Sequence, residues 1–164
     1  MKLKDLDIIV TAPPAPGWGG RYWILVKVTT DDGLSGRGVC DAASVGPEAM
    51  RAVIEDVFER HMAGESPENI ELMFRRVYSS GFTQRPDLTV IGAWSGLEIA
   101  CWDILGKARN RPSWALLGGK MNTRIRADTY RYPLPHHRPA DFWTSPDLAA
   151  EAALDCVERG YTAI

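Results

Sequence analysis

Polar and apolar residues alternate along the first forty positions in the way that is typical of strands. Residues 3–10 show this alternation, and residues 22–30 form a stronger run that is rich in aromatic and β-branched side chains. The segment between the two runs contains three prolines and three glycines, so we expect a loop there. Gly33 allows a tight reversal, after which residues 34–40 return as a short third strand. The pattern predicts a three-stranded antiparallel meander.

Apolar residues then recur at helical spacing in three segments. Pro47 marks the start of the first helix, and Ser66 with Pro67 marks the start of a second that stops near Gly81. The third helix, about residues 89–108, is the most apolar, so we expect it to be the buried centre of this half of the chain. A short helical turn at residues 113–117 then leads to two glycines, where a domain can end.

Beyond residue 120 the predicted order of elements changes to strand, helix, strand. Residues 124–132 are typical of a strand, a helix begins at Ser145 and Pro146 and stops at Gly160, and residues 161–164 start a second strand. Two parallel strands need such a crossover between them. The sequence therefore predicts a parallel α/β structure that begins near residue 124 and is cut off as its second strand starts.

Composition narrows the class of protein without pointing to a ligand. The 164 residues are 45% hydrophobic and 24% charged with a formal net charge of −2, which favours neither nucleic acid nor a membrane as a partner. We expect no run to be long and apolar enough to span a bilayer, and the N-terminus lacks the continuous apolar stretch of a signal peptide. Cys40, Cys101 and Cys156 are odd in number and far apart, so we expect reduced, packed thiols. These features predict a cytoplasmic protein.

One segment, residues 92–120, carries a recognisable set of motifs. The set comprises a small residue with a glycine (Ser95, Gly96), an aliphatic and acidic pair (Leu97, Glu98), W-D-I-x-G-K (102–107), Pro112 and L-L-G-G (116–119). It resembles the end of the N-terminal capping domain of the enolase superfamily, in the mandelate racemase and muconate lactonizing enzyme branch. The resemblance implies an α+β capping domain over residues 1–120, in which the three-stranded antiparallel meander joins a helical bundle.

The same resemblance implies that residues 121–164 are the first β/α unit of a TIM-type (β/α) barrel. A complete barrel needs about 250 residues, so we expect the chain to be truncated within the second barrel strand. The family's K-x-K base motif lies on that second strand, and its acidic metal ligands lie on the third to fifth strands. No catalytic residue and no metal ligand is therefore assigned to this chain.

The resemblance implies a Mg²⁺-dependent lyase or isomerase that abstracts a proton next to a carboxylate, with a Lys or His as the base. A polar third loop and Arg21 favour a sugar-acid dehydratase, while a cycloisomerase or racemase stays open. The expected partner is a small-molecule carboxylic acid, and we expect a homo-oligomer. If the chain really ends at residue 164, the alternative is a non-catalytic capping or binding module.

The candidate substrate-binding residues lie in loops that would close over a barrel. In the first loop Trp18 could expel water and Arg21 could pair with a carboxylate, unless Trp18 packs on its own domain. In the second loop Ser44, with Asp41, could contact a polyol or simply cap the next helix. The third loop offers a polar set that suits a hydroxylated acid, or is a plain connection between helices: Phe82, Gln84 and Arg85.

Histidines and charged helix residues complete the candidates. Adjacent side chains in an extended segment point in opposite directions, so we do not expect His136 and His137 to share one metal ion. His136 is a candidate substrate contact near the catalytic face, or else a solvated loop residue. Asp103 and Lys107, four apart on a helix, are expected to form a structural pair or network with Glu98. No glycine run has the spacing of a phosphate-binding loop.

Overall fold

The computed structural model describes residues 1–15, 17–41, 45–79 and 87–164. It divides the chain into two compact units, unit 1 at Met1–Gly119 and unit 2 at Lys120–Ile164.

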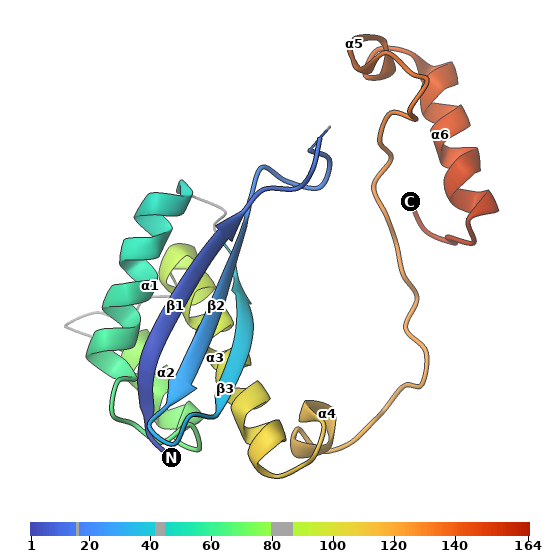
Figure 1. The fold of residues 1–164 in the computed structure, drawn as a ribbon. Coiled ribbons are helices and arrows are strands. Elements are labelled where there is room, and N and C mark those ends of the chain that lie inside the picture. The colour runs from blue at the N-terminus through green and yellow to red at the C-terminus, as the bar shows by residue number, and fades with distance from the viewer. Residues whose placement is uncertain (16, 42–44, 80–86) are drawn as a thin grey trace. The chain divides into compact units, whose positions relative to one another are not determined.

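Unit 1 contains an antiparallel sheet with the strand order β1-β2-β3 (Figure 1). The strands are β1 (Leu3–Thr11), β2 (Trp23–Thr30) and β3 (Ser35–Cys40). Ile9 pairs with Leu25, and Leu25 pairs in turn with Val39, so one row of side chains crosses all three strands. Alternate residues of β2 are buried, which matches the two-residue period of its sequence. The predicted meander is confirmed.

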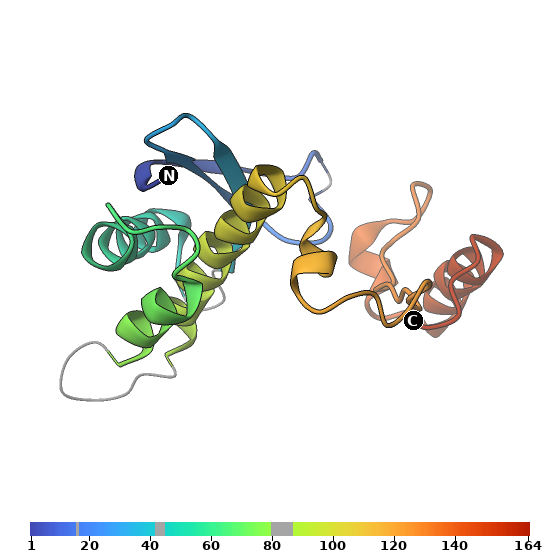
Figure 2. The ribbon, with the colours of Figure 1, turned by 90° about the horizontal axis from the view of Figure 1, so that it is seen from below.

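Four helices accompany the sheet in the described part of unit 1. They are α1 (Pro47–His61), α2 (Ile70–Tyr78), α3 (Leu88–Ala108) and α4 (Ser113–Leu116). Figure 2 shows α1, α2 and α3 on the same side of the sheet. The predicted start of the second helix was too early, because residues 66–69 form a turn in which the Asn69 amide donates to the Ser66 carbonyl oxygen at 3.0 Å. Its predicted end near Gly81 lies outside the described residues.

The third helix, α3, is the centre of unit 1, as its apolar sequence predicts. Its start is capped by the Asp87 carboxylate, which accepts from the amides of Thr89 and Val90. Its buried side chains, among them Trp94 and Leu97, face the core residues of the sheet and of α1. Among the described residues α3 is also the one helix long and apolar enough to cross a membrane, so our expectation that no segment reaches that length was wrong. Here α3 packs against β3, β2, α1 and α2, as the core helix of a folded domain does.

Unit 2 contains two helices, α5 (Pro139–Phe142) and α6 (Pro146–Glu158). The predicted helix start is confirmed, because the Ser145 hydroxyl accepts from the Leu148 amide at 3.4 Å. The predicted strands at residues 124–132 and 161–164 are not confirmed, because neither segment pairs with a strand in the described chain. A side-chain contact links them instead: Arg126 Nε donates to Thr162 Oγ1 at 2.9 Å. Without a backbone ladder, residues of high strand propensity remain irregular.

Candidate functional site

A hollow of about 440 Å³ lies where the loop before β2 meets the end of β3. Arg21 and Asp41 bring opposite charges to its lining, and Ser95, from the second turn of α3, adds a hydroxyl. Trp23 and Val39 supply apolar wall. The hollow therefore combines a guanidinium, a carboxylate and a hydroxyl beside an apolar surface, which is the usual composition of a small-molecule site.

Hydrogen bonds to backbone carbonyl oxygens fix the rim of this hollow. The Tyr22 hydroxyl donates to the carbonyl oxygen of Val45 at 2.9 Å, which ties the start of β2 to the segment before α1. The Asp41 amide donates to the Gly92 carbonyl oxygen at 3.3 Å, so the end of β3 meets the start of α3. A Cβ at Gly92 would lie 2.6 Å from the Asp41 carbonyl oxygen, so this contact requires a glycine. The start of β2, next to Arg21, is thus tied to the segment before α1, and the end of β3, next to Asp41, is tied to α3.

The structure brings only part of the predicted site together among the described residues. Arg21 is exposed and lines the hollow, as its proposed contact with a carboxylate requires. Trp18, in the same loop, is half-buried and is not a lining residue. Asp41, a candidate of the second loop, also lines the hollow. The other predicted contacts of the second and third loops lie outside the described residues: Ser44, Phe82, Gln84 and Arg85.

Two lining residues were missed as site candidates by sequence reasoning. Ser95 stood out only as the small residue of a motif, and Trp23 only as a strand former. Neither has a local sequence signal for the hollow. Trp23 reaches it from β2, which pairs with β3, and Ser95 reaches it because α3 approaches β3 closely. This approach brings residues together that are more than fifty positions apart in the chain.

The cysteines behave as packed thiols. All three are free and buried. Burial raises the pKa of the Cys40 thiol to about 12, although Cys40 lines the hollow. Burial, with a smaller effect from the Glu98 carboxylate, likewise raises the pKa of Cys101 to about 12. Neither thiol forms a thiolate near neutral pH, so neither is a nucleophile there.

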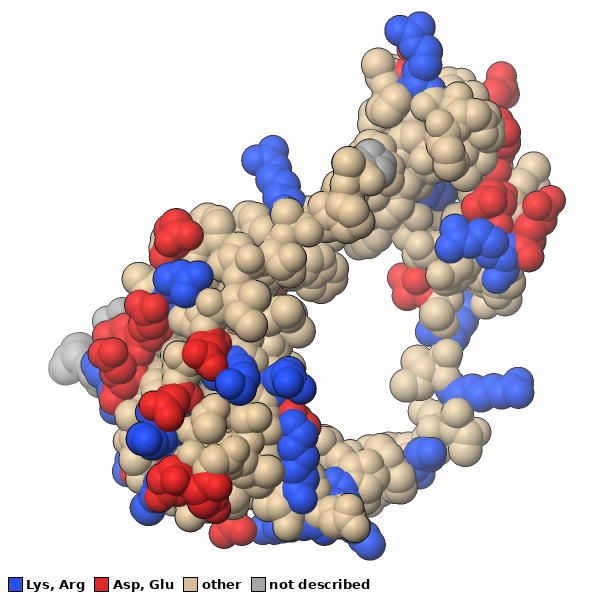
Figure 3. Space-filling model, in the orientation of Figure 1, with Lys and Arg blue, Asp and Glu red and all other residues tan. Residues whose placement is uncertain are grey.

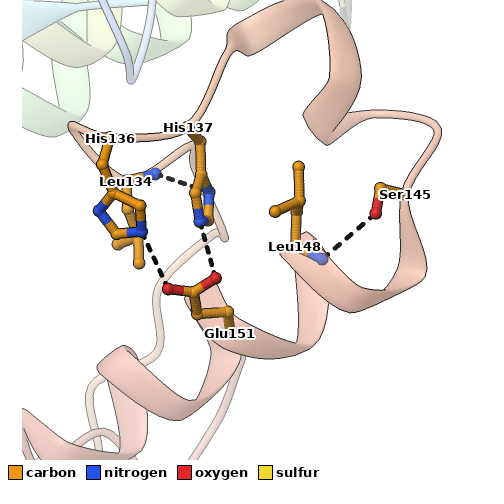
Figure 4. Close-up of polar contacts among 6 residues, drawn as sticks. All are labelled: Leu134, His136, His137, Ser145, Leu148 and Glu151. Atoms are coloured by element: carbon orange, nitrogen blue, oxygen red, sulfur yellow. Dashed lines mark hydrogen bonds and ion pairs between the residues drawn. The ribbon is translucent and has the colours of Figure 1, made fainter.

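Unit 2 brings three titratable side chains together, as Figure 4 shows. His136 Nε2 lies 2.9 Å from Glu151 Oε1, and His137 Nε2 lies 3.1 Å from Glu151 Oε2. Our expectation that the two histidines diverge was wrong, because they lie in a turn in which the His137 amide donates to the Leu134 carbonyl oxygen at 2.9 Å. Glu151, on α6, was not a candidate, since it lies fifteen positions from His136 and shares no local pattern with it.

The hydrogen bonds of this cluster decide its chemistry. Bonds from His136 first, and then from His137, hold the pKa of the Glu151 carboxyl below its usual value. The Leu134 amide donates to His137 Nδ1 at 3.2 Å, so the neutral ring carries its proton on Nε2 and donates it to Glu151. The side chain of His137 is 1% exposed, whereas that of His136 is 64% exposed. Glu151 is therefore an acceptor that holds an accessible His136 in place.

This cluster does not fit a magnesium ion, although its three potential ligand atoms lie within 4.8 Å of one another. Mg²⁺ takes oxygen ligands in near-octahedral geometry, while two of these three atoms are imidazole nitrogens. A metal ligand nitrogen must also be unprotonated, and the Leu134 amide places the proton of His137 on Nε2. The cluster is therefore held by hydrogen bonds among its own side chains.

The charged residues of α3 have structural partners, as the sequence indicated. The Glu98 carboxylate accepts from the indoles of Trp94 at 2.9 Å and Trp102 at 3.2 Å. Asp103 Oδ2 accepts from Lys107 Nζ at 2.7 Å and from the Arg37 amide at 2.9 Å. These contacts join α3 to itself and to β3, so we assign them to the fold.

Comparison with known proteins gives consistent relatives. Residues 19–118 match the model of the mandelate racemase / muconate lactonizing enzyme N-terminal domain. A mandelate racemase/muconate lactonizing enzyme-like protein from Roseovarius sp. TM1035 is 83% identical with a TM-score of 0.94, over 99% of this chain and 41% of that one. A mandelate racemase/muconate lactonizing enzyme from Sulfitobacter sp. is 77% identical with a TM-score of 0.95, over 100% and 41%.

A curated relative is more distant. The D-galactonate dehydratase family member RspA from Cellvibrio japonicus is 32% identical over 165 residues, which cover 100% of this chain and 36% of that protein. The chain thus spans just over a third of that relative.

Proposed function

Because the chain belongs to the mandelate racemase / muconate lactonizing enzyme family of the enolase superfamily, we propose that the whole protein is a lyase or isomerase that removes the proton next to a carboxylate. Unit 1 is the capping domain of this enzyme, and residues 121–164 begin its TIM-type barrel. The protein acts in the cytoplasm on a small carboxylic acid. Its family membership supports the reaction type. The hollow beside Arg21 is the observation that supports substrate binding by this chain.

The substrate we propose is a sugar acid, and the reaction is its dehydration. The proton leaves the carbon next to the carboxylate, the hydroxyl leaves the following carbon, and the two depart as water. The resulting enol becomes a 2-keto acid. Two observations support this choice: the hollow offers polar groups of both signs, and the curated relative carries the name of a D-galactonate dehydratase family member. A racemase or cycloisomerase would share the first proton transfer.

In this proposal the residues of the chain bind substrate and exclude water. Arg21 pairs its guanidinium with the carboxylate, for which its planar fork is suited. Asp41 and Ser95 accept from and donate to hydroxyl groups of the substrate, and Trp18 shields the site from water. In unit 2, His136 is presented by Glu151 as a further substrate contact. Ser44, Phe82, Gln84 and Arg85 stay predicted contacts.

The family also implies Mg²⁺, which we propose as the cofactor of the whole protein. The one cluster of potential ligands that the described residues contain, around Glu151, does not fit this ion, as its donor atoms and proton positions indicate. No step of the reaction is therefore assigned to a metal held by this chain.

The reaction is tested by a screen of sugar acids with the purified whole protein, in deuterated water that contains Mg²⁺. A dehydratase releases 2-keto acid. A racemase instead incorporates deuterium next to the carboxylate without loss of water. If no sugar acid or related hydroxy acid reacts or exchanges its proton, the protein is a non-catalytic module and the proposal fails.

Substrate binding by Arg21 is tested separately with Arg21→Ala. Loss of a charge-assisted hydrogen bond costs about 1.5–3 kcal/mol, so we expect KM to rise at least about tenfold. Arg21→Lys should retain part of the affinity because it keeps the charge. The matched control is Arg75→Ala on α2, which removes an exposed arginine that pairs with Glu71. An unchanged KM in Arg21→Ala would show that Arg21 does not bind the substrate.

A further inference from the structure

The small core of unit 2 contains a titratable ring. Among the described residues of this unit, His137 is the one buried polar side chain, and it lies with the buried apolar residues Phe142, Ala152 and Cys156. The imidazole stacks on the Phe142 ring, with 5.9 Å between the ring centroids and 26° between the ring planes. Histidine is the side chain that ordinarily gains a charge between pH 5 and 8. This core is therefore one that an added proton can disturb.

Both nitrogens of the His137 ring have partners, as Figure 4 shows. Nδ1 accepts from the Leu134 amide at 3.2 Å, and Nε2 donates to Glu151 Oε2 at 3.1 Å. The His137 amide in turn donates to the Leu134 carbonyl oxygen at 2.9 Å. Two reciprocal hydrogen bonds thus close the turn at residues 134–137. The first of them requires a neutral ring whose Nδ1 carries no proton.

A second proton on this ring has one place to go. It must bind to Nδ1, where it would point at the N–H group of Leu134, so that two donors face each other. The Leu134 amide would lose its acceptor, and a positive charge would lie buried against the Phe142 ring, which is unfavourable. If the turn opens, water solvates the ring and the proton binds freely. Because the proton prefers the open turn, acid shifts the equilibrium toward it.

The charged groups around His137 oppose this effect only weakly. The Glu151 carboxylate on α6 attracts a positive ring, but it already accepts from the neutral one, is 51% exposed and is shared with His136 at 2.9 Å. At the start of α5, Arg138 and Asp141 pair with each other at 3.7 Å. Figure 3 shows charges of both signs on the surface of unit 2, where water and salt screen them.

Glu151 itself is not the group that responds first to acid. Hydrogen bonds from His136, and then from His137, hold the pKa of its carboxyl below the usual value. The carboxylate therefore stays ionised over the range in which histidines take up a proton. A structural change between about pH 5 and about pH 8 must start at an imidazole.

We propose that His137 is a proton-sensitive latch of unit 2. The neutral ring closes the turn at residues 134–137, and uptake of a proton from water at Nδ1 opens it. When the latch opens, the Phe142 ring loses its stacking partner, and the turn no longer places the exposed His136 opposite Glu151. The device lies within unit 2 and does not depend on the proposed enzymatic function.

Nuclear magnetic resonance of the ring nitrogens tests the closed state in the unmodified protein. Their chemical shifts distinguish the two neutral forms of an imidazole from the charged form. At about pH 8, at the neutral end of the histidine range, we expect the His137 proton on Nε2 and none on Nδ1. A neutral ring with its proton on Nδ1 would overturn the proposal, because the Leu134 amide would then have no acceptor in the closed turn.

Hydrogen exchange of the Leu134 amide tests the opening. Its protection is the exchange rate of an unfolded peptide divided by its own rate, measured at the same pH. One proton is taken up on opening, so the ratio of open to closed turns rises up to about tenfold for each pH unit below the ordinary titration of histidine. We therefore expect the protection to fall at least about tenfold between about pH 7.5 and about pH 5.

Two variants identify the ring that responds. His137→Asn keeps an acceptor, the side-chain carbonyl oxygen, near the place of Nδ1 but takes up no proton, so the protection of the Leu134 amide should stay constant with pH. His136→Gln is the matched control, because it removes the adjacent exposed imidazole and should leave the acid response intact. The proposal is wrong if His137→Asn responds to acid as the unmodified protein does, or if His136→Gln abolishes the response. If His137→Asn does not fold, the ring-nitrogen measurement decides.

Discussion

At the scale of single residues, glycine decides how close the helix and the sheet come. A Cβ at Gly38 would overlap the carbonyl oxygen of Gly96, and a Cβ at Gly96 would overlap the Cys40 sulfur. The backbones of β3 and α3 therefore touch without side chains between them. This contact also sets the position of Ser95 and Asp41 on the hollow. The sequence displays these glycines, but it does not say that they face one another.

Gly38→Ala should therefore be strongly destabilising. The new methyl group has no space in the contact, so β3 and α3 must separate, and we expect a loss of about 3 kcal/mol in the free energy of unfolding. Chemical denaturation monitored by circular dichroism measures it. The matched control is Gly46→Ala, because Gly46 has an ordinary φ of −71° and nothing within 4 Å of its added Cβ. Equal stability of the two variants would contradict the close approach.

At the scale of elements, α3 closes the exposed edge of β3 with side chains. Asp103 accepts from the Arg37 amide, and Lys107, one turn later, donates to the Ser35 carbonyl oxygen. The pair thus takes the place of a fourth strand along part of this edge. This explains the W-D-I-x-G-K motif physically, because its aspartate and lysine satisfy backbone groups of the sheet. The i,i+4 spacing predicted the pair, whereas its backbone partners are a tertiary feature.

Asp103→Ala should cost about 1–2 kcal/mol of unfolding free energy, since it removes the acceptor of the Arg37 amide and the carboxylate partner of Lys107. The matched control is Asp56→Ala, which removes an i,i+4 partner of Arg60 on the surface of α1 and should cost about 0.5 kcal/mol or less. Thermal or urea unfolding of the two variants measures the two losses in unfolding free energy. A loss in Asp103→Ala no larger than that of the control would show that the β3 edge does not need its cap.

At the scale of the whole molecule, the two units differ in how much core they hold. Helix α1 buries Met50, Ile54, Val57 and Phe58, whereas α6, of similar length, buries Ala152 and Cys156. A region with few buried apolar side chains opens at a lower free energy. Unit 2 should therefore be the less stable part of this chain.

Hydrogen exchange followed by mass spectrometry tests this difference in the 164-residue chain. We expect amides of α6 to exchange at least about a hundredfold faster than those of α1, because α6 opens without disrupting a large core. The comparison of helices with similar lengths, thirteen and fifteen residues, controls for fraying at the ends. Equal protection of the two helices would mean that unit 2 is stabilised by contacts that its own core does not provide.

The sequence by itself determined the local elements of unit 1. Periodicity, prolines, caps and turn residues act over a few neighbouring positions, so they predicted the three strands, the helices and the apolar character of α3. It also carried the motif of residues 92–120, and with it the family. Of the candidate site it offered Arg21 and Asp41, whose chemistry is evident from their types.

Only the tertiary structure decided which of these residues meet. The hollow joins Arg21 to Ser95, and the unit 2 cluster joins His136 to Glu151, through packing that no local pattern encodes. The turn at residues 134–137 directs both histidines toward one carboxylate, against the expectation for an extended segment. The predicted strand at residues 124–132 is not confirmed for the same reason, because a strand needs backbone partners and those partners are supplied by the fold.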